Sequence, residues 1–452
     1  MAAPLSRRSG RVRAAATVVA TVVLVNAFLF VAFPPYVAQL QPGPPANPPP
    51  ALPAPDLDVV RWRDERFTPA LQVGGFRASQ IGDVDGDGSA ELVAVGFYGI
   101  QLGCLVVYNI SNERPVEIAN VSWVQSPLSG VKAILLRQLD GRPGAEIVVG
   151  GALLLEEDRS YTAIQIFTWR DGALLRQGGV MKVGGHGETV VQAVLPPFVG
   201  QGVDESFLSL SSEFFNDEPG VRAVLTSWHR NESGGFERGN VTAVHHETTD
   251  AAALVCPACN GRAAAIGLIG SNAAAVMIPD VAQGAVALFN QSATGFFWQT
   301  CAWLGNGSEW EFVALGQGYA TRPAGLATFV FNVTLTGARI GGYVPSSFDV
   351  PFRFSSSFAI PDQISRPWAA SNGSGRDLHV VLMTTTSEGI TSTGYRAHYA
   401  RGATLMSSVL PVWATSNATV YEVLDLRTGA AGQSRMAYLG ASGEEPAIMI
   451  PA

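Results

Sequence analysis

The sequence predicts an all-β fold, a seven-bladed β-propeller ectodomain that follows a single N-terminal transmembrane helix. A small-residue loop, a glutamate, a four-residue apolar strand and a glycine recur in one frame, which starts at positions 83, 138 and 303. These starts are 55 and 165 residues apart, and 165 is three times 55, as expected for blades or solenoid coils. Residues 57–452 hold about seven such periods without sustained helical periodicity, which fits four short strands per blade.

Four weaker copies complete the series of repeats. Each has a loop of small residues followed by an apolar strand, and they lie at 197–211, 256–270, 371–383 and 426–440. After most of the loops a second β-rich run follows at a turn's distance, for example CLVVYNI and AIQIFTW. With the three regular copies they account for seven blades.

Composition narrows the class of protein. Charged residues make up 15% of the chain, hydrophobic residues 47%, and 49 residues are glycine. This balance is typical of a β-rich, turn-rich domain and argues against disorder, which needs high charge and few apolar residues. No Lys/Arg cluster follows the N-terminus, so nothing favours nucleic acid as a partner.

The N-terminal segment predicts membrane anchoring. Residues 1–13 form a basic tail with four arginines and no acid, and residues 14–33 carry no charge. As a helix, the uncharged segment spans about 30 Å, the thickness of a bilayer core. We expect a transmembrane signal-anchor there, with the tail in the cytosol by the positive-inside rule. A cleaved signal peptide is the alternative, although its apolar region is usually about 7–15 residues long.

The remainder of the chain is expected on the extracellular or lumenal side of a single-pass type II membrane protein, at the cell surface or an endomembrane. Residues 34–57 hold ten of the 28 prolines and predict an extended, semi-rigid stalk before a propeller at 58–452. N-glycosylation sequons are spread over the whole propeller, which places it in the secretory lumen. The nine sequon residues are Asn109, Asn120, Asn231, Asn240, Asn290, Asn306, Asn332, Asn372 and Asn417.

The loop GDVDGDGSAELVAVG predicts a Ca²⁺ site. Asp83, Asp85 and Asp87 stand at alternate positions, Ser89 offers its backbone carbonyl at position seven, and Glu91 follows at position nine. Calcium takes six to eight oxygen ligands, and carboxylates so spaced in a glycine-rich loop can converge on one ion. An EF-hand is excluded because position twelve is alanine and a strand follows, not a helix. A solvated acidic turn is the alternative.

This loop resembles the FG-GAP repeat of integrin α-chains, and the resemblance extends over essentially residues 58–452. It implies a seven-bladed propeller with calcium loops in some blades, and it carries the metal ligands over to Asp83, Asp85, Asp87 and Glu91, with Glu in place of the usual Asp. It also implies that ligands meet the face opposite the calcium-loop rim. The type II arrangement is similar to the FAM234 group of FG-GAP proteins.

The other two regular copies lack a full ligand set. The second keeps Asp140 and Glu146 but has Gln138 and Arg142 where carboxylates belong. Arg142 could take the cation's place by pairing with these acids. The third copy keeps only Glu311, and its loop carries a sequon. We therefore expect one calcium loop.

The four cysteines, Cys104, Cys256, Cys259 and Cys301, are disulfide candidates with three possible connectivities. Cys256 and Cys259 form a CxxC motif, which is a redox site in a thioredoxin-like βαβ setting. Here the motif falls in a β-repeat loop, so a structural bridge is the preferred interpretation, with Cys301 as a further possible partner.

These features favour a binding module over an enzyme. We expect a membrane-anchored, calcium-stabilised, glycosylated propeller that binds an unknown extracellular or lumenal protein or glycan. A type II propeller enzyme acting on glycans or lipids, or a viral attachment glycoprotein, is the alternative. Aromatic residues such as Trp298 and Trp368 are candidate interface anchors, and blade-to-blade core packing is the competing interpretation.

Overall fold

The computed structural model describes most of the chain after residue 51. The described residues are 52–64, 74–98, 102–111, 114–124, 131, 133–156, 159–183, 189–201, 205–214, 221–244, 248–270, 273–279, 285–290, 296–318, 325–353, 363–372, 375–386, 389–400, 408–416, 418–428, 433–443 and 445–452. The predicted basic tail and transmembrane helix, most of the predicted stalk and Asn417 lie outside them. Within the described part of the chain, no helix has the length and hydropathy of a membrane span.

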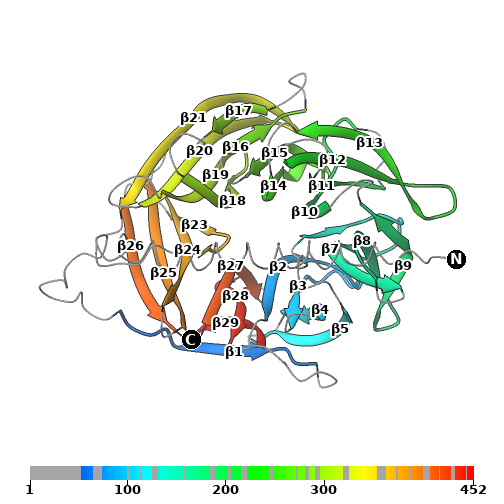
Figure 1. Ribbon diagram of the computed structural model, residues 1–452, viewed down its shortest axis with the longest axis horizontal. Coiled ribbons are helices and arrows are strands. Elements are labelled where there is room, and N and C mark those ends of the chain that lie inside the picture. The colour runs from blue at the N-terminus through cyan, green and yellow to red at the C-terminus, as the bar shows by residue number, and fades with distance from the viewer. Residues whose placement is uncertain are drawn as a thin grey trace, which may run out of the picture. The chain divides into compact units, whose positions relative to one another are not determined.

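Seven antiparallel sheets form a ring, which confirms the predicted seven-bladed β-propeller (Figure 1). Blade 1 contains β2 (Gly75–Gly82), β3 (Glu91–Tyr98), β4 (Leu102–Asn109) and β5 (Val116–Val124). Blade 2 contains β6 (Ala133–Arg137), β7 (Glu146–Glu156), β8 (Arg159–Arg170) and β9 (Ala173–Lys182). Blade 3 contains β10 (Thr189–Leu195), β11 (Ser206–Phe214), β12 (Val221–Arg230) and β13 (Phe236–Val244).

Blades 4 and 5 repeat this four-strand order, blade 6 has five strands, and blade 7 takes its outermost strand from the start of the described chain. Blade 4 contains β14 (Asp250–Val255), β15 (Ala263–Ile269), β16 (Ala273–Met277) and β17 (Ala285–Asn290). Blade 5 contains β18 (Phe296–Asn306), β19 (Glu309–Gly318), β20 (Gly325–Thr336) and β21 (Arg339–Arg353). Blade 6 contains β22 (Gln363–Ile364), β23 (Trp368–Asn372), β24 (Gly375–Thr386), β25 (Gly389–Ala400) and β26 (Ser408–Thr415). Blade 7 contains β27 (Ala418–Thr428), β28 (Gln433–Ser442), β29 (Glu445–Pro451) and β1 (Leu57–Arg61).

The two ends of the described chain close the ring. Strand β1 pairs antiparallel with β29 and supplies the fourth strand of blade 7. The backbone N–H of Trp62 donates to Pro446 O at 2.8 Å, and that of Ala452 donates to Asp56 O at 3.0 Å. The chain that leaves the predicted stalk is therefore built into the last blade, and β1 begins at Leu57, the last residue assigned to the stalk.

Each predicted repeat copy lies where one blade's first strand turns into its second. The loop at 83–91 joins β2 to β3, the loop at 138–146 joins β6 to β7, and the weaker copies occupy the same place in blades 3, 4, 6 and 7. The 55-residue period therefore predicted the position of the first loop in each blade as well as the number of blades. The short helix η1 (Pro257–Cys259) lies in the blade 4 copy.

The apolar strand of each frame is buried on both faces because it lies between two neighbouring blades. In β3, Leu92 and Ala94 pack into the cluster shared with blade 7, whereas Val93 and Val95 pack into the cluster shared with blade 2. A run without polar alternation is the pattern of a strand covered on both sides. Trp298 is fully buried and Trp368 packs against the blade 7 core, so for these two aromatic residues core packing is the correct interpretation.

The glycine that ends the first frame is required by close backbone approach. A Cβ atom on Gly96 would lie 2.1 Å from the carbonyl oxygen of Gly75 on the paired strand β2. The register of β2 against β3 shifts at this point, between Phe76 and Ala78. Only a residue without a side chain fits there.

Candidate metal loop and central cavity

The predicted calcium loop is a tight turn between β2 and β3. Gly86 and Gly88 adopt φ angles of +80° and +87°, which L residues with side chains rarely adopt. The loop bends around its own acidic side chains, because their carboxylates accept backbone N–H groups of the loop. Gly86 and Gly88 donate to Asp83 at 2.7 and 3.1 Å, and Val84 donates to Glu91 at 2.9 Å.

The structure brings three of the four predicted carboxylates together. Oxygens of Asp83, Asp85 and Glu91 all lie within 4.8 Å of one another. Asp87 is outside this group, and its carboxylate accepts the backbone N–H of Ser89 at 2.6 Å. The three grouped side chains offer the hard oxygen donors that Ca²⁺ prefers.

The electrostatics of the loop also fit a cation. Glu91 is buried, and this burial raises the pKa of its carboxyl. The carboxylates of Asp85, Asp87 and Asp83 raise the pKa further by repulsion. A bound cation would remove this repulsion and favour the ionised form.

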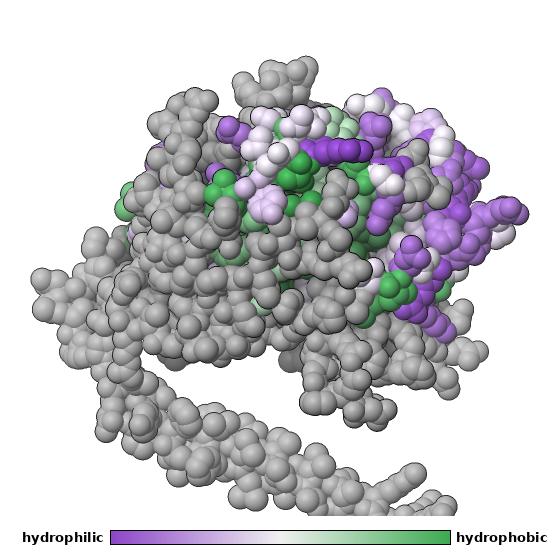
Figure 2. Space-filling model, turned by 90° about the horizontal axis from the view of Figure 1, so that it is seen from above, coloured by the Kyte–Doolittle hydropathy of each residue, from purple (hydrophilic) through white to green (hydrophobic). Residues whose placement is uncertain are grey.

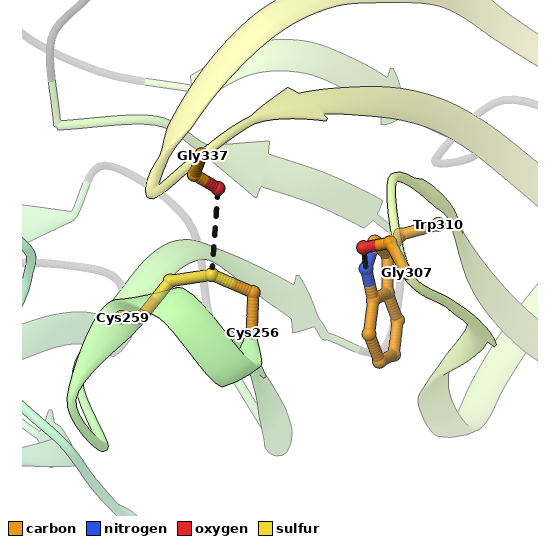
Figure 3. Close-up of a disulfide and its surroundings, with 5 residues drawn as sticks. All are labelled: Cys256, Cys259, Gly307, Trp310 and Gly337. Carbon is orange, nitrogen blue, oxygen red and sulfur yellow. Dashed lines mark hydrogen bonds between the residues drawn. A yellow bond between two sulfur atoms is a disulfide. The ribbon is translucent and has the colours of Figure 1, made fainter.

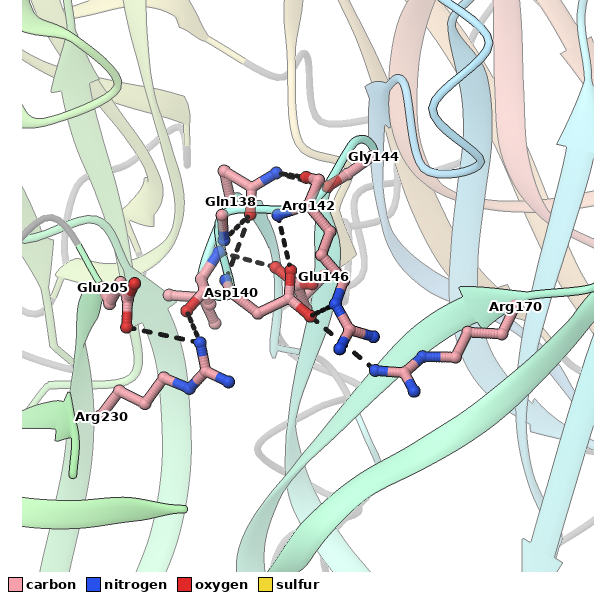
Figure 4. A network of polar contacts seen from close by, with 10 residues as sticks. Gln138, Asp140, Arg142, Gly144, Glu146, Arg170, Glu205 and Arg230 are labelled. Carbon is pink, nitrogen blue, oxygen red and sulfur yellow. Dashed lines mark hydrogen bonds and ion pairs between the residues drawn. The ribbon is translucent and has the colours of Figure 1, made fainter. Parts of the chain in front are cut away.

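The loop of blade 2 repeats the same turn with different side chains (Figure 4). Leu139 N donates to Glu146 at 2.6 Å, as Val84 N does to Glu91 in blade 1. Gly141 N donates to Gln138 Oε1 at 2.9 Å, and Arg142 N donates to Asp140 at 3.0 Å. The hydrogen bonds that shape the turn are therefore kept, although two of the carboxylates are replaced.

In blade 2, side-chain donors occupy the region where the blade 1 loop has carboxylates alone. The amide Nε2 of Gln138 donates to the carbonyls of Arg142 and Gly144, at 2.9 Å for Gly144. Gly144 is position seven, whose carbonyl in the blade 1 loop was predicted to bind the metal. Asp140 is paired with Arg142 at 3.7 Å and with Arg170 at 3.9 Å (Figure 4). Burial, together with Asp140, raises the pKa of Glu146 to about 7.

The two loops contact each other directly. Ala145 N donates to the backbone oxygen of Asp83 at 2.8 Å. A Cβ on Gly86 would lie 2.8 Å from the Cβ of Pro143, and one on Gly144 would lie 2.7 Å from Val84 O. The blade 1 loop therefore packs on one side against the blade 2 loop, in which Arg142 pairs with Asp140.

The third regular copy has no comparable loop. Strands β18 and β19 are paired as far as Asn306 and Glu309, which leaves a two-residue turn with Gly307 at φ +62°. Trp310 Nε1 donates to Gly307 O across this turn at 3.1 Å (Figure 3). A turn of this length has no room for the alternating ligands of the blade 1 loop.

The structure contains one disulfide among the four predicted candidates. Cys256 and Cys259 are joined at either end of η1, with Cys256 Sγ 3.8 Å from Gly337 O (Figure 3). Cys104 and Cys301 are free buried thiols, and burial raises the pKa of each. The bridge is thus local to the loop, and it does not include Cys301, which had been considered as a partner.

The predicted glycosylation residues differ in exposure. Asn120 on β5 and Asn240 on β13 are exposed. Figure 2 shows hydrophilic residues gathered on the side of the molecule where β13 lies. Asn332 lies within β20 and is half-buried, and its Oδ1 has no hydrogen-bond partner among the described residues. Asn109 ends β4 and accepts the N–H of Ser111 at 2.9 Å.

A central cavity of about 430 Å³ is the feature that sequence reasoning missed. It is lined by the first strands of blades 1 to 5 and by Arg366, which lies between β22 and β23. Arg366 Nη2 is 3.3 Å from both oxygens of Asp250 in blade 4, and Nη1 is 3.7 Å from Glu422 in blade 7. Glu422 also accepts the hydroxyl of Ser79 in blade 1 at 2.8 Å.

No protein-family model matches this chain, and no curated protein matches it in sequence. Three solved structures show a similar arrangement of strands. A chain of apo ctPRC2 in an autoinhibited state is 10% identical, with 88% of this chain and 98% of that chain covered, at a TM-score of 0.47. A chain of the S. cerevisiae core factor is 9% identical (87% and 60% covered, TM-score 0.48), and Drosophila Semaphorin 1b, extracellular domains 1-2, is 10% identical (84% and 87% covered, TM-score 0.32).

Proposed function

We propose that this chain is a membrane-anchored, N-glycosylated β-propeller binding module of the FG-GAP type. It uses Ca²⁺ to stabilise its first blade, and it recognises an extracellular or lumenal protein or glycan. The blade 1 loop carries the proposal, because Asp83, Asp85 and Glu91 converge there while the blade 2 loop keeps the same turn with Gln138 and Arg142 in place of carboxylates.

The comparison between the two loops supports a cation in the first. A turn that gathers carboxylates is unfavourable unless something compensates their charge. In blade 2 the compensation comes from Arg142 and Arg170, which pair with Asp140. The structure gives no such ion pair to Asp83, Asp85 or Glu91 among the described residues, so an external cation is the simplest compensation.

A binding role follows from how a propeller is built. Its strands are covered by neighbouring blades, so the loops at the two ends and the central cavity are the surfaces left for recognition. A partner on the face opposite the calcium-loop rim is the arrangement that the FG-GAP resemblance implies. The predicted anchor at 14–33 and the nine sequons would present this domain outside the cytosol.

The test is a screen for partners and for turnover. The full-length chain, purified in detergent from a secretory host, is applied to arrays of glycans and of cell-surface proteins. In parallel it is incubated with generic glycosidase, sialidase and phosphodiesterase substrates. We expect a bound protein or glycan and no turnover. Turnover that one Asp or Glu substitution abolishes, while the melting temperature is unchanged, would establish the enzyme alternative instead.

A further inference from the structure

The central cavity has the size and the lining of a small-ligand site. Its volume of about 430 Å³ lies in the range of about 300–1,000 Å³ that is usual for such pockets. The wall combines alanines and aliphatic side chains of the first strands with polar groups, and polar and apolar atoms contribute about equally to its surface. A ligand that fills it would therefore need both hydrogen-bonding groups and apolar surface.

The polar groups centre on Arg366, a half-buried guanidinium with unused donors. Its Nη2 donates to Asp250 Oδ1 and Oδ2, both at 3.3 Å, and its Nη1 is 3.7 Å from Glu422, beyond hydrogen-bond length. Among the described residues, no hydrogen bond is made by its Nε–H or by its Nη1 N–H groups. Three of the five N–H donors of the planar guanidinium therefore remain for a ligand.

The charge around Arg366 selects against an anion. Asp250 alone balances the guanidinium, and Glu422 adds a second carboxylate nearby. The cluster therefore offers donors without a surplus positive charge to hold a phosphate, sulfate or free carboxylate. Groups that both accept from the guanidinium and donate to a carboxylate satisfy it best, and alcohol hydroxyls are such groups.

Two indole rings also line the cavity and are held in place. Trp303 Nε1 donates to Ala252 O at 2.9 Å, and Trp310 Nε1 donates to Gly307 O at 3.1 Å. Both side chains are half-buried and pack against the core between blades 4 and 5. Because their N–H groups are already used, they present apolar ring surface to the cavity.

We propose that the cavity binds a neutral saccharide. Its hydroxyls accept from Arg366 and donate to Asp250, and the C–H face of a sugar ring packs against Trp303 or Trp310. This inference rests on the proposed binding function and names the ligand class and the residues that select it. The cavity is a site distinct from the calcium loop, since neither Asp83 nor Glu91 lines it.

The test compares variants of the cavity with a surface control. The detergent-purified full-length chain is applied to immobilised neutral oligosaccharides of hexose and N-acetylhexosamine, and to their sialylated and sulfated counterparts. Arg366→Met removes the donors, and Ala302→Leu fills the cavity without removing an interaction. Leu410→Ala, on the outer strand β26 and 63% exposed, is the control. Melting temperature is recorded for each variant.

We expect binding to neutral saccharides that both cavity variants reduce at least tenfold and that the control leaves unchanged, because Arg366→Met removes hydrogen bonds from a charged group and Ala302→Leu fills the space. If Arg366→Met fails to fold, Ala302→Leu decides. Neutral saccharides bound equally by all variants, or acidic ones bound more tightly, would overturn the inference alone. Binding to a protein partner but to no saccharide would likewise overturn the saccharide inference and leave the proposed function standing. Binding to no partner on either array would overturn both.

Discussion

Without calcium, the Asp85→Asn variant should be at least as stable as the wild type. With calcium, the wild type should become the more stable of the two. Oxygens of Asp83, Asp85 and Glu91 lie within 4.8 Å of one another. At this separation two unit charges repel by about 0.9 kcal/mol even at the dielectric constant of water. Asp85 takes part in two of the three pairs, so Asp85→Asn relieves about 2 kcal/mol by this calculation. Asparagine Oδ1 can still accept the N–H of Asp87, which donates to Asp85 at 3.0 Å.

We expect calcium to reverse this balance in the wild type. For a Kd of about 10⁻⁴–10⁻³ M, typical of extracellular calcium modules, 10 mM Ca²⁺ stabilises the folded state by about 1.4–2.7 kcal/mol. For a cooperative unit of about 400 residues, this is a rise in melting temperature of about 2–3 °C. In chelator, Asp85→Asn should melt at or above the wild type. In 10 mM Ca²⁺, the wild type should gain this shift and the variant little of it.

The blade 2 loop supplies the matched control. Asp140→Asn replaces the residue at the same loop position and breaks the pairs with Arg142 and Arg170. We expect it to lower stability modestly, by about 1 kcal/mol or less since both arginines are largely exposed, in chelator and in calcium alike. Scanning calorimetry of the three proteins in both buffers measures the differences. Equal calcium shifts in the wild type and Asp85→Asn would refute the metal assignment.

Three further predictions address topology, pH dependence and ring closure. In microsomes, protease should remove an N-terminal tag and leave a glycosidase-sensitive ectodomain; a protected tag, or a mature N-terminus after residue 33, would contradict the anchor. The pKa of the Glu146 carboxyl is about 7 in the folded protein and 4.5 in the unfolded chain, so the folded state binds this proton more strongly. The free energy of unfolding should therefore fall by at most about 3 kcal/mol as the pH rises from 4.5 to 7. Glu146→Gln should flatten this dependence, as denaturant titrations at several pH values would show, and an unchanged slope would refute it. Deleting 57–61 removes the β1–β29 pairing and should lower the melting temperature by several degrees, whereas an unchanged value would mean that closure adds no stability.

The central cluster shows why part of the candidate chemistry escapes sequence reasoning. Asp250 and Arg366 are 116 residues apart, and Ser79 and Glu422 are 343 residues apart. No spacing rule connects such residues, because their distance depends on how seven blades close into a ring. The disulfide is a local feature by comparison: the CxxC spacing already favoured a structural bridge, and the structure adds that Cys256 pairs with Cys259 while Cys104 and Cys301 stay free.

The blades and the turn of the acidic loop, in contrast, could be predicted from the residues alone, because their causes are local; calcium binding by this loop stays a prediction. Leu92 to Val95 is apolar throughout since both faces of one strand are covered, and this leaves a pattern within four residues. The acidic loop draws its carboxylates from nine consecutive residues, so their convergence depends on one turn. Closure by β1 on β29, the salt bridges of Arg366 and the shape of the central cavity join distant segments, and they exist only after the whole ring has formed.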